Sequence, residues 1–139
     1  MKRFNPTLPM PAYKTAGAAG IDLAARETVV IAPQAFGYVP LNVAVALPEG
    51  YWGLLTARSS LHKRGLLLGN GVAVMDPDYR GPEDEYIAIL YNTTSEPVTI
   101  ETKERIVQLI LLPLSRFPIS EDPLLHQPNR GGIGSTGTL

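Results

Sequence analysis

The sequence contains no cysteine and only two histidines, His62 and His126. The lack of cysteine excludes disulfide bonds, thiolate zinc sites and a cysteine nucleophile, and two imidazoles cannot form a multi-histidine metal site. The net charge of -1 lacks the basic excess of a general nucleic-acid-binding protein. No apolar segment of signal-peptide length follows Met1-Lys2-Arg3, because prolines interrupt it. We therefore expect a cytoplasmic protein that binds neither nucleic acid nor membrane.

Windows long enough for a helix are also scarce, because thirteen prolines and thirteen glycines are spread over the 139 residues. Short β-rich runs fill the intervals, and the length is that of one ordinary domain. We expect an all-β fold, a distorted jelly roll or closed β-barrel of many short strands with one short helical turn. The expected strands are residues 28–31, 38–47, 51–55, 66–68, 72–75, 86–91, 98–101 and 105–113.

Hydrophobic patterns indicate which strand faces are buried. Residues 42–47 alternate in character, which predicts that one face lies in the core. Residues 106–112 are apolar on both faces except for Gln108, which predicts a strand inside the barrel or in a subunit interface. A buried amide must be hydrogen-bonded, so Gln108 either is satisfied by the core or points into a site.

Turn signals separate the expected strands. Asn70-Gly71 is a strong signal for a tight β-hairpin. A helical turn is expected over residues 61–64, where a hydroxyl of Ser59 or Ser60 can cap the start and Gly65 can end it.

The C-terminal segment Arg130–Gly137 has a composition that suits phosphate oxygens. It combines glycine amides, the hydroxyls of Ser135 and Thr136, and one guanidinium. A literal G-x-G-x-x-G is present, but the dinucleotide-binding fold needs a helix after it and only two residues remain. A P-loop is excluded because no lysine precedes Ser135. The other interpretation is a frayed glycine-rich terminus.

Two segments in the first half of the chain carry charged or hydroxyl side chains beside apolar residues. Asp22 lies between small and apolar residues, so it must meet a backbone donor, a cation or metal-bound water, or else bond its own turn. In Arg58-Ser59-Ser60, a guanidinium and two hydroxyls at the start of a helical turn can chelate phosphate oxygens. The alternative is a plain helix cap beside a surface arginine.

Asp76 follows an expected strand and precedes Pro77. A proline-fixed bend can hold this carboxylate at a strand end, facing a cleft, as a general base requires. Tyr79 then offers a flat face for a sugar or a base. The alternative is that Asp76 and Asp78 are solvated turn residues.

Taken in order, these segments resemble the five motifs of the trimeric deoxyuridine triphosphatase (dUTPase) family, and the resemblance spans nearly the whole chain. The matching segments are Ala16–Leu23, Ala57–Gly65, Gly71–Gly81, Glu104–Leu109 and Arg130–Gly137.

The resemblance implies a homotrimeric hydrolase that converts dUTP to dUMP and pyrophosphate with Mg²⁺ held mainly by the triphosphate. Such an enzyme limits uracil incorporation into DNA and supplies dUMP for thymidylate synthesis. The resemblance further implies a β-barrel domain over residues 1–129 and a flexible tail over residues 130–139 that closes over a neighbouring subunit's site. Asp76 would activate the attacking water, and Asp22 would hold the metal through water.

The substrate contacts are implied in the same way. Arg58, Ser59, Ser60 and Gln108 would bind phosphates, the segment from Asn70 to Met75 would read uracil, and Tyr79 would pack on the deoxyribose and exclude a 2′-hydroxyl. The full implied set of substrate-binding residues is Arg58, Ser59, Ser60, Asn70, Val74, Met75, Tyr79, Gln108, Arg130, Ile133, Gly134, Ser135 and Thr136.

The sequence departs from the family pattern at three places. Ile133 stands where the tail usually has an aromatic residue, Ala73 replaces a frequent glycine, and residues 82–85 look like a small insertion that alters the uracil pocket or a subunit contact. Two alternatives share the fold: a dCTP deaminase and a nucleotide-dependent regulatory or binding protein. The deaminase requires a glutamate base where this chain has Ile89, which favours the hydrolase.

Overall fold

The computed structural model describes residues 1–123, 125, 128–129 and 131–132. Within them the fold is almost entirely β, with one short 3₁₀ helix, so the all-β prediction is confirmed. The chain carries β1 (Lys2–Arg3), β2 (Gly20–Ala24), β3 (Val29–Ile31), β4 (Phe36–Pro40), β5 (Val43–Ala44), β6 (Tyr51–Ala57), η1 (Leu61–Arg64), β7 (Leu66–Leu68), β8 (Ala73–Met75), β9 (Ile87–Asn92), β10 (Val98–Ile100) and β11 (Arg105–Pro113).

The described strands form two main antiparallel sheets. The four-stranded sheet has the order β2-β11-β6-β8, the three-stranded sheet has the order β4-β9-β7, and the pairs β1-β5 and β10-β3 complete the barrel. Apolar side chains from both sheets meet in one core. Its largest fully buried side chains include Tyr86, Leu23, Ile31, Leu41, Leu55, Leu66, Leu90, Ile100, Ile106 and Leu109.

The expected strand over residues 38–47 is wrong. β4 ends at Pro40, Asn42 has a φ of 66°, and β5 contains only Val43 and Ala44. The side chain of Asn42 donates to the backbone oxygen of Asn5 at 3.1 Å, and its own oxygen accepts from the amide of Asn5 at 2.6 Å. The predicted alternation over residues 42–47 also fails, because four consecutive residues from Asn42 to Val45 are buried. A proline, which lacks an N–H, and a left-handed residue break the strand and let the chain turn inward.

The Asn70-Gly71 turn is present, but the predicted hairpin is wrong. Gly71 has a φ of 69° and its amide donates to the oxygen of Leu68 at 2.9 Å. The two flanking strands then enter different sheets, because β7 pairs with β9 and β8 pairs with β6. The Asn70-Gly71 signal therefore predicts the reversal of the chain, whereas tertiary packing decides which strands pair with β7 and β8.

The 3₁₀ helix η1 lies over the predicted residues and ends at Gly65, which adopts a φ of 67°. Ser60 occupies the N-cap position without a side-chain capping hydrogen bond, so the predicted hydroxyl cap is not formed. Burial of Leu61 and the backbone hydrogen bond from its amide to Arg58 O at 2.9 Å hold the turn instead.

β11 is central in the larger sheet, and its two faces differ. Val107 and Leu109 face the core. Its other face carries Gln108, Ile110 and Leu112, which stand opposite Thr56, Leu54 and Trp52 of β6 in the strand register. These side chains are only partly buried, so an apolar strip lies on the outer face of the sheet.

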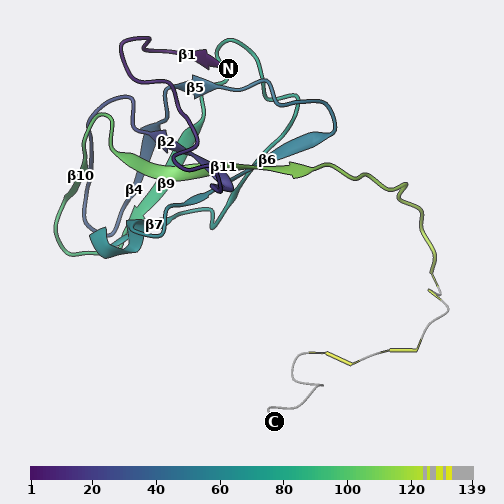
Figure 1. The fold of residues 1–139 in the computed structure, drawn as a ribbon. Helices are drawn as coiled ribbons and strands as arrows, with labels where there is room; N and C mark the ends of the chain where they lie inside the picture. Colours follow the sequence, from purple (N-terminus) through teal and green to yellow (C-terminus); the bar gives the residue numbers. More distant parts are fainter. Residues whose placement is uncertain (124, 126–127, 130, 133–139) are drawn as a thin grey trace.

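After β11 the described chain leaves the barrel as an extended arm (Figure 1). The amide of Leu114 still donates to Gly50 O at 2.8 Å, but Phe117 and Ile119 are 80% and 91% exposed. Within the described residues, no helix is long and apolar enough to cross a membrane.

Candidate active site

Asp22 on β2 lies between two arginines from other parts of the chain. Its Oδ1 is 3.2 Å from Nε of Arg58, and its Oδ2 accepts from Nη1 of Arg105 at 2.9 Å. The carboxylate is only 13% exposed. Asp22 therefore meets cations, as one of its sequence interpretations required, and the turn-bonded alternative is not observed.

The register of the four-stranded sheet assembles this cluster. Gln108 on β11 stands opposite Asp22 on one side and opposite Thr56 on the other. The strand β6 then leads directly into Arg58, whose amide donates to Ile106 O at 3.2 Å and whose Nη1 donates to Arg105 O at 3.0 Å. The strand register thus places a carboxylate beside an amide, and Arg58, just after β6, brings a guanidinium to the carboxylate.

Gln108 is half-buried, and its Nε2 lies 3.5 Å from Ala57 O, the single acceptor found for it in the described chain. A side chain at Gly20 would bring its Cβ to 3.2 Å from Oε1 of Gln108, so this glycine leaves room for the amide. Since a weak, long hydrogen bond leaves most of the amide's capacity unused, Gln108 is available to a ligand.

The electrostatics of the cluster favour an anion. Two guanidinium groups surround one carboxylate, and the exposed Ser59 and Ser60 follow Arg58 at the start of η1. Guanidinium groups with hydroxyl donors form strong charge-assisted hydrogen bonds to phosphate oxygens. The plain-cap alternative for Ser59-Ser60 loses support because no side-chain cap is made.

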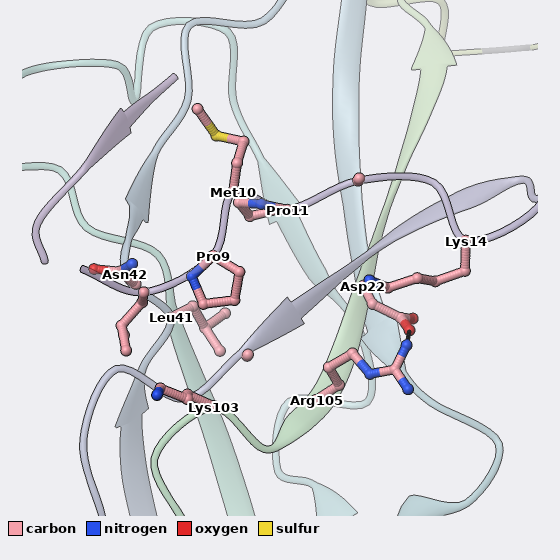
Figure 2. Close-up of a pocket in the computed structure, with 12 residues that line it drawn as sticks. Pro9, Met10, Pro11, Lys14, Asp22, Leu41, Asn42, Lys103 and Arg105 are labelled. Carbon is pink, nitrogen blue, oxygen red and sulfur yellow. Dashed lines mark hydrogen bonds and ion pairs between the residues drawn. The ribbon is translucent and has the colours of Figure 1, made fainter. Parts of the chain in front are cut away.

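A cavity of about 220 Å³ adjoins the cluster beneath the N-terminal segment. Figure 2 shows Asp22 and Arg105 paired at one end of it and Lys103, Leu41 and Asn42 toward the other. Lys14 also lines it, which adds a further cation near the carboxylate. Arg105 is the residue that our sequence analysis missed as a site residue, because only the pairing of β2 with β11 brings it to Asp22.

The second group of predicted residues lines a separate cavity of about 330 Å³. Val74, Met75, Asp76 and Tyr79 contribute to it. Asp76 follows β8 directly and is exposed, and its backbone oxygen accepts from the amide of Tyr79 at 3.1 Å. Within the described residues its carboxylate has no hydrogen bond or ion pair, which leaves it free to accept a proton. Asn70 is exposed at the turn before β8.

One chain does not bring the two groups together. The register pairs Gly53 with Met75, which places Asp76 near the level of Trp52, six residues before Arg58, which directly follows β6. At about 3.3 Å per residue, Asp76 and Arg58 are roughly 20 Å apart along the sheet. A site containing both requires more than one subunit. The predicted tail residues Arg130, Ile133, Gly134, Ser135 and Thr136 lie outside the described residues.

Burial raises the pKa of Tyr86, which lies behind Tyr79, to about 12, and the charge of Tyr79 adds to the shift. The unfolded tyrosine ionises near 10, so the neutral folded form contributes stability below pH 10 that is lost as the pH rises toward 12. We expect the wild type to lose about 2 to 3 kcal/mol more stability than Tyr86→Phe between pH 9 and pH 12. Urea denaturation across this range measures the difference. Tyr38→Phe, at an exposed position, should behave as the wild type does.

Taken together, the barrel, the arginine-flanked carboxylate and the exposed Asp76 define a small all-β protein equipped for a phosphate-rich ligand. The sequence model of the dUTPase family matches residues 7–137. A deoxyuridine 5′-triphosphate nucleotidohydrolase of Hahella chejuensis is 38% identical over 99% of this chain and 92% of that protein. The chain belongs to the dUTPase family.

Solved structures agree with this assignment. The crystal structure of dUTPase from Streptococcus mutans is similar with a TM-score of 0.77 and 34% identity, covering 84% of this chain and 93% of that one. A mutant dUTPase of Staphylococcus bacteriophage 80alpha with dUpNHpp has a TM-score of 0.82 and 26% identity, covering 98% and 96%. The jelly-roll prediction is confirmed by this likeness and by the all-β fold.

Proposed function

We propose that this protein hydrolyses dUTP to dUMP and pyrophosphate by attack of an Asp76-activated water on the α-phosphorus. The observation that carries the proposal is the cluster of Asp22, Gln108 and Arg58 at the edge of the four-stranded sheet, in a chain of the dUTPase family. Phosphoryl transfer needs positioning, charge neutralisation and an oriented nucleophile more than covalent chemistry. The cluster supplies positioning and charge neutralisation, and Asp76 orients the nucleophile.

Arg58 exchanges partners when the triphosphate binds. In the free chain its Nε is 3.2 Å from Oδ1 of Asp22. A triphosphate carries more negative charge than one carboxylate, so the guanidinium turns to the phosphate oxygens while Ser59 and Ser60 donate beside it. Arg105 keeps Oδ2 of Asp22 in place during the exchange. Gln108 contacts the phosphate chain near the reacting centre.

The residues present fit a Mg²⁺ ion that is held chiefly by the substrate. Among the described residues, no group of three or more histidine, aspartate and glutamate side chains gathers to form a protein cage. Mg²⁺ commonly keeps several waters and binds one or two carboxylates together with substrate phosphates. Asp22, once released by Arg58, would hold such an ion through water. When bound, the ion neutralises charge that develops on the phosphates.

The nucleoside lies against the cavity at Asp76. Val74 is 60% exposed whereas Met75 is buried, so the backbone from Asn70 to Met75 reads the uracil edge while the Met75 side chain stays in the core. Tyr79 packs on the deoxyribose. A tight backbone segment excludes the thymine methyl group, and cytosine presents the wrong hydrogen-bonding edge.

The active unit is a homotrimer with shared sites. Three features support this assembly: the separation of Asp76 from Arg58 on one chain, the apolar strip on the outer face of β6 and β11, and the exposed Phe117 and Ile119 on the arm. Because these apolar side chains are exposed or partly exposed in a single chain, their burial against another copy of the protein is favourable. The tail over residues 130–139 then closes over a neighbour's substrate and grips its distal phosphates with Arg130, Ser135 and Thr136. Ile133 and Gly134 complete the lid.

The enzyme acts in the cytoplasm, where it limits uracil in DNA and supplies dUMP. A dCTP deaminase is less well supported, because Ile89 on β9 stands opposite Tyr38 and provides no carboxylate base. A purely regulatory binding protein would not require the free carboxylate of Asp76.

A nucleotide panel tests the function. With Mg²⁺, we expect rapid pyrophosphate release from dUTP, and release from dCTP, dTTP and UTP that is slower by about 100-fold or more. Pyrophosphate release and ammonia release are measured on the same samples. Ammonia from dCTP would replace the hydrolase with a deaminase, and nucleotide binding without any product would leave only the regulatory role.

A further inference from the structure

The ring of Tyr79 rests on a second tyrosine, Tyr86. The two rings are stacked, with centroids 6.1 Å apart and an interplanar angle of 16°. Tyr79 is 40% exposed and lines the cavity at Asp76, whereas Tyr86 is fully buried and does not line it. The attraction between two aromatic rings at this separation adds to the stabilisation that comes from burying their surfaces. The buried ring of Tyr86 therefore supports the exposed ring of Tyr79.

Main-chain hydrogen bonds hold Tyr86 in place within the core. The amide of Tyr86 donates to Val43 O at 2.8 Å, and Tyr86 O accepts from the amide of Leu41 at 2.9 Å. Because the side chain is packed in the main core, the ring of Tyr86 cannot move without disturbing several strands.

The residue beside it, Glu85, orients the other end of Tyr79. The Tyr79 hydroxyl donates to Glu85 O at 3.2 Å. The Glu85 carboxylate in turn accepts from Nε of Arg26 at 2.8 Å and from the amide of Asn42 at 2.9 Å. Tyr79 is thus held at its ring face and at its hydroxyl by consecutive residues.

The turn that precedes these residues brings them into place. The amide of Gly81 donates to Oδ2 of Asp84 at 2.6 Å, and the amide of Asp84 donates to Gly81 O at 3.2 Å. The chain folds back on itself here, so residues 85 and 86 return beneath Tyr79. Residues 82–85, which looked like an insertion in the sequence, form part of this support.

We propose that Tyr86 is a positioning residue that fixes Tyr79 against the sugar and thereby sets the discrimination between deoxyribose and ribose. This inference rests on the proposed function, in which Tyr79 packs on the deoxyribose. A packing surface excludes an added 2′-hydroxyl only if it cannot retreat, because the group is small and a mobile ring would accommodate it.

The ring of Tyr86, rather than its hydroxyl, carries this role. Among the described residues, the Tyr86 hydroxyl is the one buried side-chain polar atom without a hydrogen-bond partner. A buried group without a partner costs stability, so its removal relieves a penalty. Tyr86→Phe retains the stack and should keep the selectivity while raising the melting temperature.

The test compares kcat/KM for dUTP with kcat/KM for UTP. Tyr86→Leu keeps an apolar side chain at the buried position but offers no flat face, and we expect it to lower the dUTP/UTP ratio by about tenfold. Tyr86→Phe should keep the ratio within about twofold of the wild type. Leu90→Ala, at a fully buried position on β9, controls for lost packing, because it should lower the melting temperature without changing the ratio.

The outcomes separate this inference from the function on which it rests. If the wild type does not hydrolyse dUTP, the proposed function and this inference both fail. If Tyr79→Ala leaves the ratio unchanged in an active enzyme, the sugar contact is wrong and the inference fails with it. If Tyr79→Ala lowers the ratio but Tyr86→Leu only lowers the melting temperature, as Leu90→Ala does, Tyr86 is merely structural and this inference alone is overturned.

Discussion

Asp76→Asn is expected to lower kcat for dUTP hydrolysis by about 10²- to 10⁴-fold. Asparagine has nearly the same shape as aspartate, but it cannot accept the proton of the attacking water. Asp76 is exposed and its carboxylate has no partner among the described residues, so the substitution should leave the melting temperature unchanged. The measurement is single-turnover pyrophosphate release with dUTP and Mg²⁺.

Asp78→Asn is the matched control. Asp78 is also an exposed aspartate and lies two residues away on the same bend. Its replacement by asparagine removes the same charge. It should retain most of the activity. Equal losses from both substitutions would indicate a general electrostatic effect, and full activity in Asp76→Asn would remove this residue from the mechanism.

Activity should return when two inactive variants are combined in one assembly. Because Asp76 and Arg58 are separated along one chain, the proposed shared site takes Asp76 from one subunit and Arg58 from another. Co-expression of Asp76→Asn with Arg58→Gln produces mixed trimers in which some sites receive both intact residues. Whichever variant contributes two of the three subunits, one of the three sites in a mixed trimer receives both intact residues, so we expect about a third of the wild-type activity.

A second mixture provides the control. Arg58→Gln combined with Gln108→Leu places both defects in residues that the sheet register brings together on one subunit. No site can then receive both intact residues, so the activity should stay at the level of the separate variants. Recovery in both mixtures, or in neither, would contradict the shared site. The measurement is dUTP hydrolysis by mixed trimers isolated with two different affinity tags.

The strands of this protein could be predicted best where the sequence carries a strong apolar run. The run from Arg105 to Pro113 was predicted with its observed limits, because it is long, β-rich and buried on one face by the core. β2 was not predicted as a strand, since Gly20–Ala24 is short and contains a charged residue. These residues form a strand because they pair with β11. The β propensity of the residues themselves does not predict that pairing.

The candidate site shows the same division. The chemistry of Asp22, Arg58, Gln108 and Asp76, and their order along the chain, predict them as candidate site residues. Arg105 lies within one of the matching segments, but the sequence does not predict its contact, because its partner Asp22 lies 83 residues away. Tyr86 was read only as part of a strand, since nothing in the sequence indicates which ring it will stack on.

The order of residues alone established an all-β chain, the places where it turns, and the polar groups available for phosphate chemistry, because these depend on side-chain type and local backbone preference. Tertiary structure decided which strands pair and which side chains lie next to one another. It sent β7 and β8 into different sheets, set Arg105 and Arg58 on either side of Asp22, and kept Asp76 away from all three. The reason is that strand pairing is chosen by the burial of both sheets in one core, which is a property of the whole chain.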